Sequence, residues 1–158
     1  MDDLVTIHAS NSGTFVFNGA LTGSGGLTRT STFSTLILAA DNSYAGPTTI
    51  SAGTLQIGSD GATGTLGSGA VTSNGTLRVD RSGIVEVGND ISGTGSVLIH
   101  GPTINDVVRF SGDNTFAGEV RATSGSLRIT DASQFGSGTK NVVVDGAAGA
   151  IRFDGTAG

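Results

Sequence analysis

Few side chains in this sequence could serve as acids, bases, nucleophiles or metal ligands. The two histidines, His8 and His100, lie far apart in the chain, and there is no cysteine. A structural zinc site would need cysteine or histidine ligands at short, regular spacing. No serine stands in the Gly-x-Ser-x-Gly pattern of a hydrolase nucleophile. We therefore predict no catalytic, no cofactor-binding and no metal-ligating residue, and no bound cofactor.

The carboxylates are considered separately, because polysaccharide lyases and hydrolases with β-helix folds act through Asp, Glu, Arg and bound calcium. Most acids here stand among Gly, Ser, Asn and Thr, as turn residues do. Asp41 and Asp113 occupy equivalent positions of a repeat described below, which indicates a structural turn. The other acids that we assign to turns are Asp60, Asp131 and Asp145. Because repeated residues are structural and catalytic ones tend to be unique, we predict that the chain is not an enzyme.

Two charge pairs also recur, Arg78-x-Asp80 and Arg152-x-Asp154. In each, apolar residues alternate with the charged ones, so both charges should point outward from a strand. An exposed ion pair of this kind contributes less than about 1 kcal/mol to stability. His100 follows an apolar run and precedes Gly-Pro, so we interpret it as a turn residue.

Composition excludes several classes of protein. Of 158 residues, 27 are glycine, 13% are charged and 36% are hydrophobic, which leaves enough apolar material for a core and argues against disorder. The net charge is −5 and the basic residues are scattered, so nucleic acid is not expected as a partner. No apolar run is long enough for a transmembrane segment. The opening Met1-Asp2-Asp3 is unlike a signal peptide, and we expect a fragment of a longer chain.

An internal repeat is the main structural signal. The segment from Leu36 to Gly46 matches the segment from Val108 to Gly118 in its apolar, Asp-Asn, aromatic and Gly positions, at an offset of 72 (108 − 36). Residues 51–57 match residues 123–129 at the same offset. A β-sandwich also has many short strands, but it does not predict a sequence period. The repeat therefore favours a solenoid.

Apolar residues also recur two apart, which places both on one face of a strand. In Leu55-Gln56-Ile57, for example, the apolar pair should point inward and Gln56 should face solvent. Such pairs recur roughly every 20 residues, as expected of coils that stack and complete one another's core. The pairs are Leu36/Leu38, Leu55/Ile57, Leu77/Val79, Val85/Val87, Val108/Phe110, Leu127/Ile129 and Ile151/Phe153. We predict an all-β, right-handed parallel β-helix, with residues 1–158 as a single segment.

The turns should depend on residues that tolerate positive φ. Four glycines precede a strand by one residue, and we predict left-handed corners at Gly13, Gly53, Gly75 and Gly125. Asn42 and Asn114 stand in equivalent turns, where Asn also adopts the left-handed region and bonds locally to the backbone. Threonine-rich strands such as Thr48-Thr49 resemble the flat threonine arrays of ice-binding solenoids, but we expect no regular threonine on every coil.

With these motifs stated, the run from Gly25-Gly26-Leu27-Thr28 through Ser51-Ala52-Gly53-Thr54-Leu55 to Gly58 resembles the passenger-associated transport repeat, also called the autotransporter-associated β-strand repeat. One copy covers about residues 25–58. A second, degenerate copy covers about 95–130, where Glu119-Val120-Arg121-Ala122 replaces the Thr-Thr-Ile strand. The resemblance implies a passenger secreted to the surface of a Gram-negative bacterium and attached, in its full-length parent, to the outer membrane.

The leading functional hypothesis is a non-enzymatic structural or adhesive passenger segment, whose repeat aids secretion and folding. Its expected partners are host-cell or neighbouring-cell surface molecules or glycans. Two alternatives remain open at this point. One is a carbohydrate-active β-helix enzyme of the polysaccharide lyase or hydrolase kind. The other is a self-assembling filament subunit, which would associate through unpaired end strands.

Overall fold

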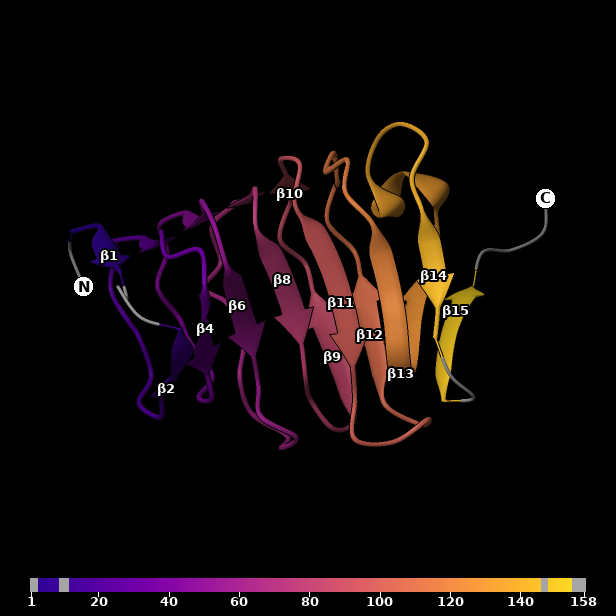
Figure 1. Ribbon diagram of the computed structural model, residues 1–158, viewed down its shortest axis with the longest axis horizontal. Coiled ribbons are helices and arrows are strands. Elements are labelled where there is room, and N and C mark those ends of the chain that lie inside the picture. The colour runs from indigo at the N-terminus through magenta and orange to yellow at the C-terminus, as the bar shows by residue number, and fades with distance from the viewer. Residues whose placement is uncertain (1–2, 9–11, 146–147, 155–158) are drawn as a thin grey trace.

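The computed structural model describes residues 3–8, 12–145 and 148–154, and these form a parallel β-solenoid of about seven turns. Successive strands lie side by side along one long axis, from the N-terminal end to the C-terminal end (Figure 1). Every strand pairing in the described chain is parallel, as the registers show for β4 with β6 and for β8 with β11. One short 3₁₀ helix, η1 (Ala132–Phe135), interrupts them. The predicted all-β solenoid is confirmed.

The strands form three faces, A, B and C, and each described coil contributes strands to two or three of them. Face A consists of β1 (Val5–Ile7), β3 (Leu27–Arg29), β5 (Thr48–Ile50), β7 (Val71–Ser73) and β10 (Ile91–Ser92). Face B consists of β2 (Gly13–Phe17), β4 (Ser34–Leu38), β6 (Thr54–Ile57), β8 (Thr76–Val79), β11 (Ser96–His100), the first half of β13 (Val120–Ile129) and β14 (Val142–Val144). Face C consists of β9 (Ile84–Val87), β12 (Val107–Phe110), the second half of β13 and β15 (Gly149–Phe153). The long strand β13 joins faces B and C.

The core is made by the apolar pairs that were predicted to point inward. Leu55 pairs in register with Leu36 on one side and Leu77 on the other, and all three are at most 1% exposed. Each coil therefore buries its neighbours' side chains as well as its own, which is why no single coil could be stable alone. The inward assignment is confirmed for six of the seven pairs. In the seventh, Phe153 stands in the row of Ile129 but is 66% exposed, because it lies on the last described strand.

Gln56 points outward as predicted, but the prediction that it faces solvent is wrong. Gln56 does alternate with the inward pair, but it is only 5% exposed, and its Nε2 donates to the carbonyl oxygen of Gly58 at 2.8 Å. Its neighbours in the outward row on either side are Ile37, itself 8% exposed, and Arg78. Stacked outward side chains cover one another, so strand parity alone does not determine exposure.

The glycine corners are of two physical kinds. Gly53 and Gly125 have φ of +70° and +75°, which confirms the predicted left-handed corners. Gly13 and Gly75 are not among the positive-φ residues of the described chain, so that prediction is wrong for them. Gly75 is needed for a different reason, because a Cβ there would lie 2.4 Å from the carbonyl oxygen of Gly53 on the adjacent coil.

The two copies of the repeat lie on different faces of the solenoid. In the first copy, β4 and β6 pair on face B with β5 of face A between them. The equivalent strands of the second copy are β12 and the second half of β13, on face C, with the first half of β13 on face B between them. Coils also differ in length, since the step from Leu36 to its register partner Leu55 is shorter than the step from Gly125 to Gly149. The second copy thus starts three coils after the first, and on the next face of the solenoid.

Candidate functional site: the repeated turn and the outer faces

The repeated Asp-Asn turn fastens three successive coils together through one side chain. Asn42 Oδ1 accepts the backbone N–H of Leu21, one coil earlier, at 2.8 Å. Its Nδ2 donates to the carbonyl oxygen of Thr65, one coil later, at 2.6 Å, and to that of Ala40 at 2.9 Å. Asparagine suits this position because its amide carries an acceptor and two donors in one plane. We call this arrangement the asparagine staple.

Asn114 makes the same staple in the second copy. Its Oδ1 accepts the N–H of Ile91 at 2.9 Å, and its Nδ2 donates to the carbonyl oxygen of Gln134 at 2.7 Å. Neither asparagine has positive φ, so the predicted left-handed backbone is wrong. The bonds are also not only local, since they span about one coil in each direction. The sequence showed that these positions were equivalent, but not that they join three coils.

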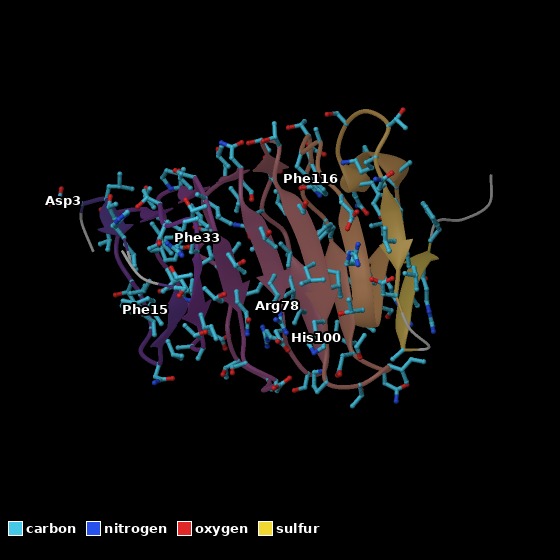
Figure 2. All side chains as sticks on the ribbon, viewed as in Figure 1. Asp3, Phe15, Phe33, Arg78, His100 and Phe116 are labelled. Carbon is cyan, nitrogen blue, oxygen red and sulfur yellow. The ribbon has the colours of Figure 1, made fainter. Side chains whose placement is uncertain are left out.

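The aromatic residue two positions later closes the turn from inside. Tyr44 and Phe116 are both fully buried, and Figure 2 labels Phe116 near the edge of the stack. The Tyr44 hydroxyl lies 2.6 Å from Thr48 Oγ1, and burial raises the pKa of this phenol. The glycine that follows allows close coil contact, because a Cβ on Gly118 would lie 2.1 Å from the carbonyl oxygen of Gly95. The staple, the buried aromatic ring and the glycine together pack each copy of the repeat closely against the adjacent coils.

The acids that were assigned to turns have structural contacts. Asp41 Oδ1 accepts the N–H of Gly64 at 2.9 Å, and the N–H of Asp113 donates to Asp90 Oδ1 at 2.8 Å. Asp131 caps the 3₁₀ helix η1 through the N–H of Ser133 at 2.8 Å. All three acids lie outside the strands, as predicted; Asp41 and Asp131 make these contacts through their carboxylates and Asp113 through its backbone N–H.

Asp106 performs a similar role in the turn between β11 and β12. Its Oδ1 accepts the N–H of Gly83 on the preceding coil, and its Oδ2 accepts the N–H of Thr103, both at 2.6 Å. Burial raises the pKa of this carboxyl, but the two backbone hydrogen bonds outweigh burial and lower the pKa below its usual value. Asp106 has no equivalent in the repeat, so its sequence context gave no signal of this role.

The two recurring charge pairs differ from the prediction. Arg78 Nη2 does bind Asp80 Oδ2, at 2.6 Å, but the Asp80 side chain is only 6% exposed, so this is not a surface ion pair. Asp154 is bound instead by Arg128 of the preceding coil, at 3.4 Å, and no ion pair joins it to Arg152 in the described chain. The arginine that pairs with Asp154 is therefore determined by the register between coils and not by adjacency in the sequence.

One group of possible metal ligands is brought together that the sequence did not reveal. Single atoms of Asp60, Asp80 and His100 all lie within 4.8 Å of one another. His100 is the last residue of β11 and not a turn residue, and Figure 2 shows it on the same side of the molecule as Arg78. The only sequence signal was an equal spacing, about the length of one coil, between successive members.

The outer side of face A carries a row of hydroxyl groups. Thr28, Thr49 and Thr72 are in register on β3, β5 and β7, with Thr6 and Ser92 at the two ends of the row. Inward residues alternate with them and are buried, as in Val71-Thr72-Ser73, so the hydroxyls point outward. The expectation that no threonine register is kept is therefore wrong on this face.

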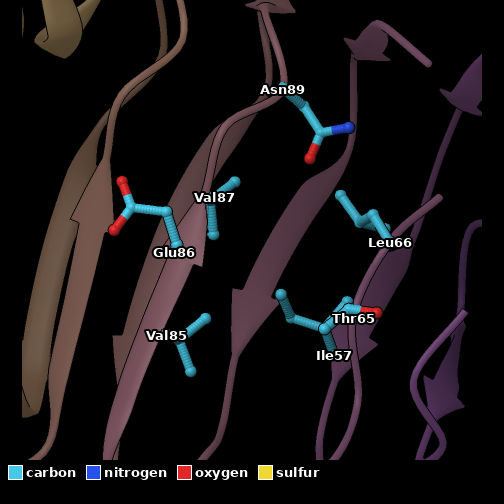
Figure 3. Close-up of a pocket in the computed structure, with 7 residues that line it drawn as sticks. All are labelled: Ile57, Thr65, Leu66, Val85, Glu86, Val87 and Asn89. Atoms are coloured by element: carbon cyan, nitrogen blue, oxygen red, sulfur yellow. The ribbon is translucent and has the colours of Figure 1, made fainter. Parts of the chain in front are cut away.

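A small internal hollow, a cavity of about 40 Å³, lies where face C begins (Figure 3). In the described part of the chain β9 is the first strand of face C, and its residues Val85 and Val87 line the hollow together with residues of the loop that precedes β7. A space of this size holds a water molecule or two, far below the roughly 300 Å³ of a small-molecule pocket. The lining residues are Ile57, Thr65, Leu66, Val85, Glu86, Val87 and Asn89.

Fold and turns define a class: a solenoid built from short parallel strands, whose coils are joined by repeated side-chain staples. The model of the passenger-associated-transport-repeat family matches residues 34–57 and 107–129, and each match contains one staple with its aromatic and glycine. The adhesin BmaC autotransporter of Brucella suis is 35% identical over 132 residues, which cover 71% of this chain and 4% of that protein. No solved structure matches the chain significantly. The chain is a β-solenoid segment of the autotransporter passenger type and carries two passenger-associated-transport-repeats.

None of the described residues forms a helix that is long and apolar enough to cross a membrane.

Proposed function

We propose that this chain is a non-enzymatic structural and adhesive segment of a passenger at the surface of a Gram-negative bacterium, and that its repeated turn aids folding during secretion. The observation that carries the proposal is the asparagine staple, which occurs once in each family match and joins three coils. The family is named for passenger transport and the relative is named an adhesin. Both favour this function over a carbohydrate-active enzyme or a filament subunit.

The staple supports a role in secretion because its hydrogen bonds stabilise each coil as soon as that coil stacks on the one before it. A coil that contacts only its neighbours can fold onto an already folded one without waiting for distant sequence. Asn114 offers its Oδ1 to the preceding coil and its Nδ2 to the following one. Each new coil therefore completes the hydrogen bonds of the last, and a chain that emerges progressively folds from one end.

The hydroxyl row of face A supports a role in adhesion. Threonine side chains in register lie about 4.8 Å apart, and they form a straight polar stripe that is held rigid by the backbone ladder. Hydroxyls donate and accept, as the groups of a glycan do, so the stripe suits polar surface molecules of host or neighbouring cells. We assign the adhesive surface of this segment to this row.

The test uses the full-length parent protein displayed on bacteria. Replacing Thr28, Thr49 and Thr72 together by Val keeps the shape and the strand propensity but removes three hydroxyls. We expect adhesion to host or neighbouring cells to fall at least several-fold, while the amount displayed and its resistance to protease stay unchanged. Glu86→Gln, an exposed change on face C, is the control and should leave adhesion intact. Unchanged adhesion in the triple variant would refute the assignment of the surface.

The role in secretion is tested separately, with Asn42→Ala and Asn114→Ala combined. We expect the amount of passenger at the surface to fall, with unfolded or degraded chain behind it, whereas Asn105→Ala in an exposed turn should be displayed normally. Normal display of the double variant would refute the secretion role and leave the adhesive role standing.

For the isolated chain, in which β2 is the last strand of its sheet, self-association through end strands is a further proposal, distinct from the filament subunit that the comparisons do not favour. All of the edge strand β2 is exposed, including Phe15 and Phe17, and Phe33 beside this end of the stack is 81% exposed (Figure 2). An edge strand with exposed aromatics can pair with another chain. Size-exclusion chromatography of the isolated chain should show dimers that Phe15→Lys abolishes; a monomer at all concentrations would contradict the proposal.

A further inference from the structure

Three side chains meet at the corner where face B ends, on three successive coils. Asp60 follows β6, Asp80 follows β8 and His100 ends β11. The backbone fixes their approach: the N–H of Asp60 donates to the carbonyl oxygen of Asp80 at 3.2 Å, and the residue before Asp80 is in register with the residue before His100. Their nearest candidate ligand atoms lie within 4.8 Å of one another.

Asp80 presents a buried oxygen that accepts no hydrogen bond while Asp60 and Asp80 are both ionised. Its side chain is 6% exposed; Arg78 holds Oδ2, but Oδ1 is buried and has no hydrogen-bond partner. A buried carboxylate oxygen left unpaired is costly. A bound cation would satisfy the unpaired oxygen and reduce the repulsion between the two carboxylates.

The hydrogen bonds around His100 favour the tautomer that can bind a metal ion through Nε2. Its Nδ1 lies 3.0 Å from Thr123 Oγ1, and that hydroxyl donates its one proton to the carbonyl oxygen of Ile99 at 3.3 Å. With the proton placed there, Thr123 accepts from His100 Nδ1, and this assignment leaves Nε2 with its lone pair. A ring nitrogen oriented by a hydrogen bond from the other nitrogen is the usual arrangement of a metal-binding histidine.

We propose that Asp60, Asp80 and His100 bind one divalent transition-metal ion, with Zn²⁺ as the best fit, which clips three coils of the solenoid together. One imidazole and two carboxylates are ligands that zinc accepts, and three protein ligands leave a position for water on the exposed Asp60 side. Two carboxylates beside one Arg78 leave a net charge of −1, which favours a dication. These three ligands fit Ca²⁺ and Mg²⁺ less well than Zn²⁺, because Ca²⁺ and Mg²⁺ prefer six or more oxygen ligands.

Ligand atoms about 2.0–2.2 Å from a common ion would lie closer together than 4.8 Å. Asp60 is exposed and stands in a turn, with φ of +59°, so its side chain is the least constrained of the three. Asp80 and His100 are each held by one hydrogen-bond partner, Arg78 and Thr123. Because the unfolded chain does not bring the three ligands together, binding should stabilise the folded solenoid.

The experiment titrates the purified chain, stripped with EDTA and dialysed, with ZnCl₂. Isothermal calorimetry should give one ion per chain, and the Tm followed by circular dichroism should rise by about 5–10 °C at a hundredfold excess over Kd. His100→Gln and Asp60→Asn should each weaken Zn²⁺ binding at least tenfold. His8→Gln is the matched control, because His8 Nδ1 also lies 2.9 Å from a threonine hydroxyl, that of Thr30, without the two carboxylates.

Asp60→Asn guards against a variant that fails to fold, because Asn tolerates positive φ and keeps the turn. The metal-free Tm of each variant is measured first, and a normal value shows that the loss of binding is not a loss of fold. The proposal is overturned if the wild-type chain shows no single saturable Zn²⁺ site. It is also overturned if His8→Gln weakens binding as much as His100→Gln does, or if CaCl₂ binds as tightly as ZnCl₂.

Discussion

Removing the Asn114 staple should destabilise the solenoid far more than removing an exposed asparagine. The Asn114 side chain makes two hydrogen bonds, and Ile91, whose N–H it accepts, is 1% exposed. Asn114→Ala therefore loses two bonds worth about 1 kcal/mol each and leaves a buried N–H unpaired, at a further cost of about 1–2 kcal/mol. We expect a total loss of about 3–4 kcal/mol in the free energy of unfolding.

The measurement is urea unfolding followed by far-ultraviolet circular dichroism, with the m-value fitted as well as the midpoint. Because a solenoid can open locally, hydrogen exchange at the amide of Ile91 is recorded in parallel, and its protection should fall in Asn114→Ala. Asn114→Asp separates the two bonds: it keeps an acceptor for Ile91 but places a carboxylate against the carbonyl of Gln134. It should therefore lose stability while the Ile91 amide stays protected.

Asn105→Ala, in an exposed turn, is the control and should change stability by less than about 0.5 kcal/mol. The reasoning is refuted if Asn114→Ala costs no more than this control. It is refuted equally if exchange at Ile91 is unchanged, since the bond from Ile91 would then not limit opening of the coil.

Three other predictions concern the core, a corner and pH. Leu55→Ala should cost about 2–4 kcal/mol in urea unfolding, whereas Thr72→Ala on the outside should cost less than about 0.5 kcal/mol; equal costs would contradict the assigned faces. Gly53→Val should strongly destabilise the chain, because φ is +70° and a Cβ would lie 2.0 Å from a backbone oxygen, while Gly13→Val, with nothing within 4 Å, should be tolerated; the Tm of both decides. Asp106 has a lowered pKa in the folded chain, so its contribution to stability is fully present above the ordinary value of 3.8 and is lost as pH falls through the lowered one. Acidification in this range should therefore reduce the free energy of unfolding more in wild type than in Asp106→Asn, which starts less stable at neutral pH; parallel pH curves for the two would contradict this.

Much of the fold could be predicted because the relevant signal is periodic. Apolar residues two apart, as in Leu77 and Val79, recur with the coil, and burial of such rows is what a stack of strands requires. Gly53 and Gly125 were predictable for the same reason, since a left-handed corner that recurs selects glycine each time. The repeat also identified the family, because its turn residues Asn42 and Asn114 are specific in type and spacing.

Contacts between coils could not be predicted, because they depend on register. Coil length varies along the solenoid, so position along the chain does not tell which residues stack. The burial of Gln56, the pairing of Asp154 with Arg128 and the need for glycine at Gly75 all follow from the adjacent coil. So does the turn of the second repeat copy onto another face.

The sequence by itself determined that this chain is a parallel solenoid, which residues form its core and which turns repeat, because hydrophobic period and turn chemistry are local properties. Only the tertiary structure decided what each turn is for. Asn42 joins coils on either side of its own, the threonines of face A form one stripe, and Asp60, Asp80 and His100 converge although each stands a whole coil away from the next along the chain. Stacking at about 4.8 Å turns residues one coil apart into neighbours, and the length of each coil decides which ones they are.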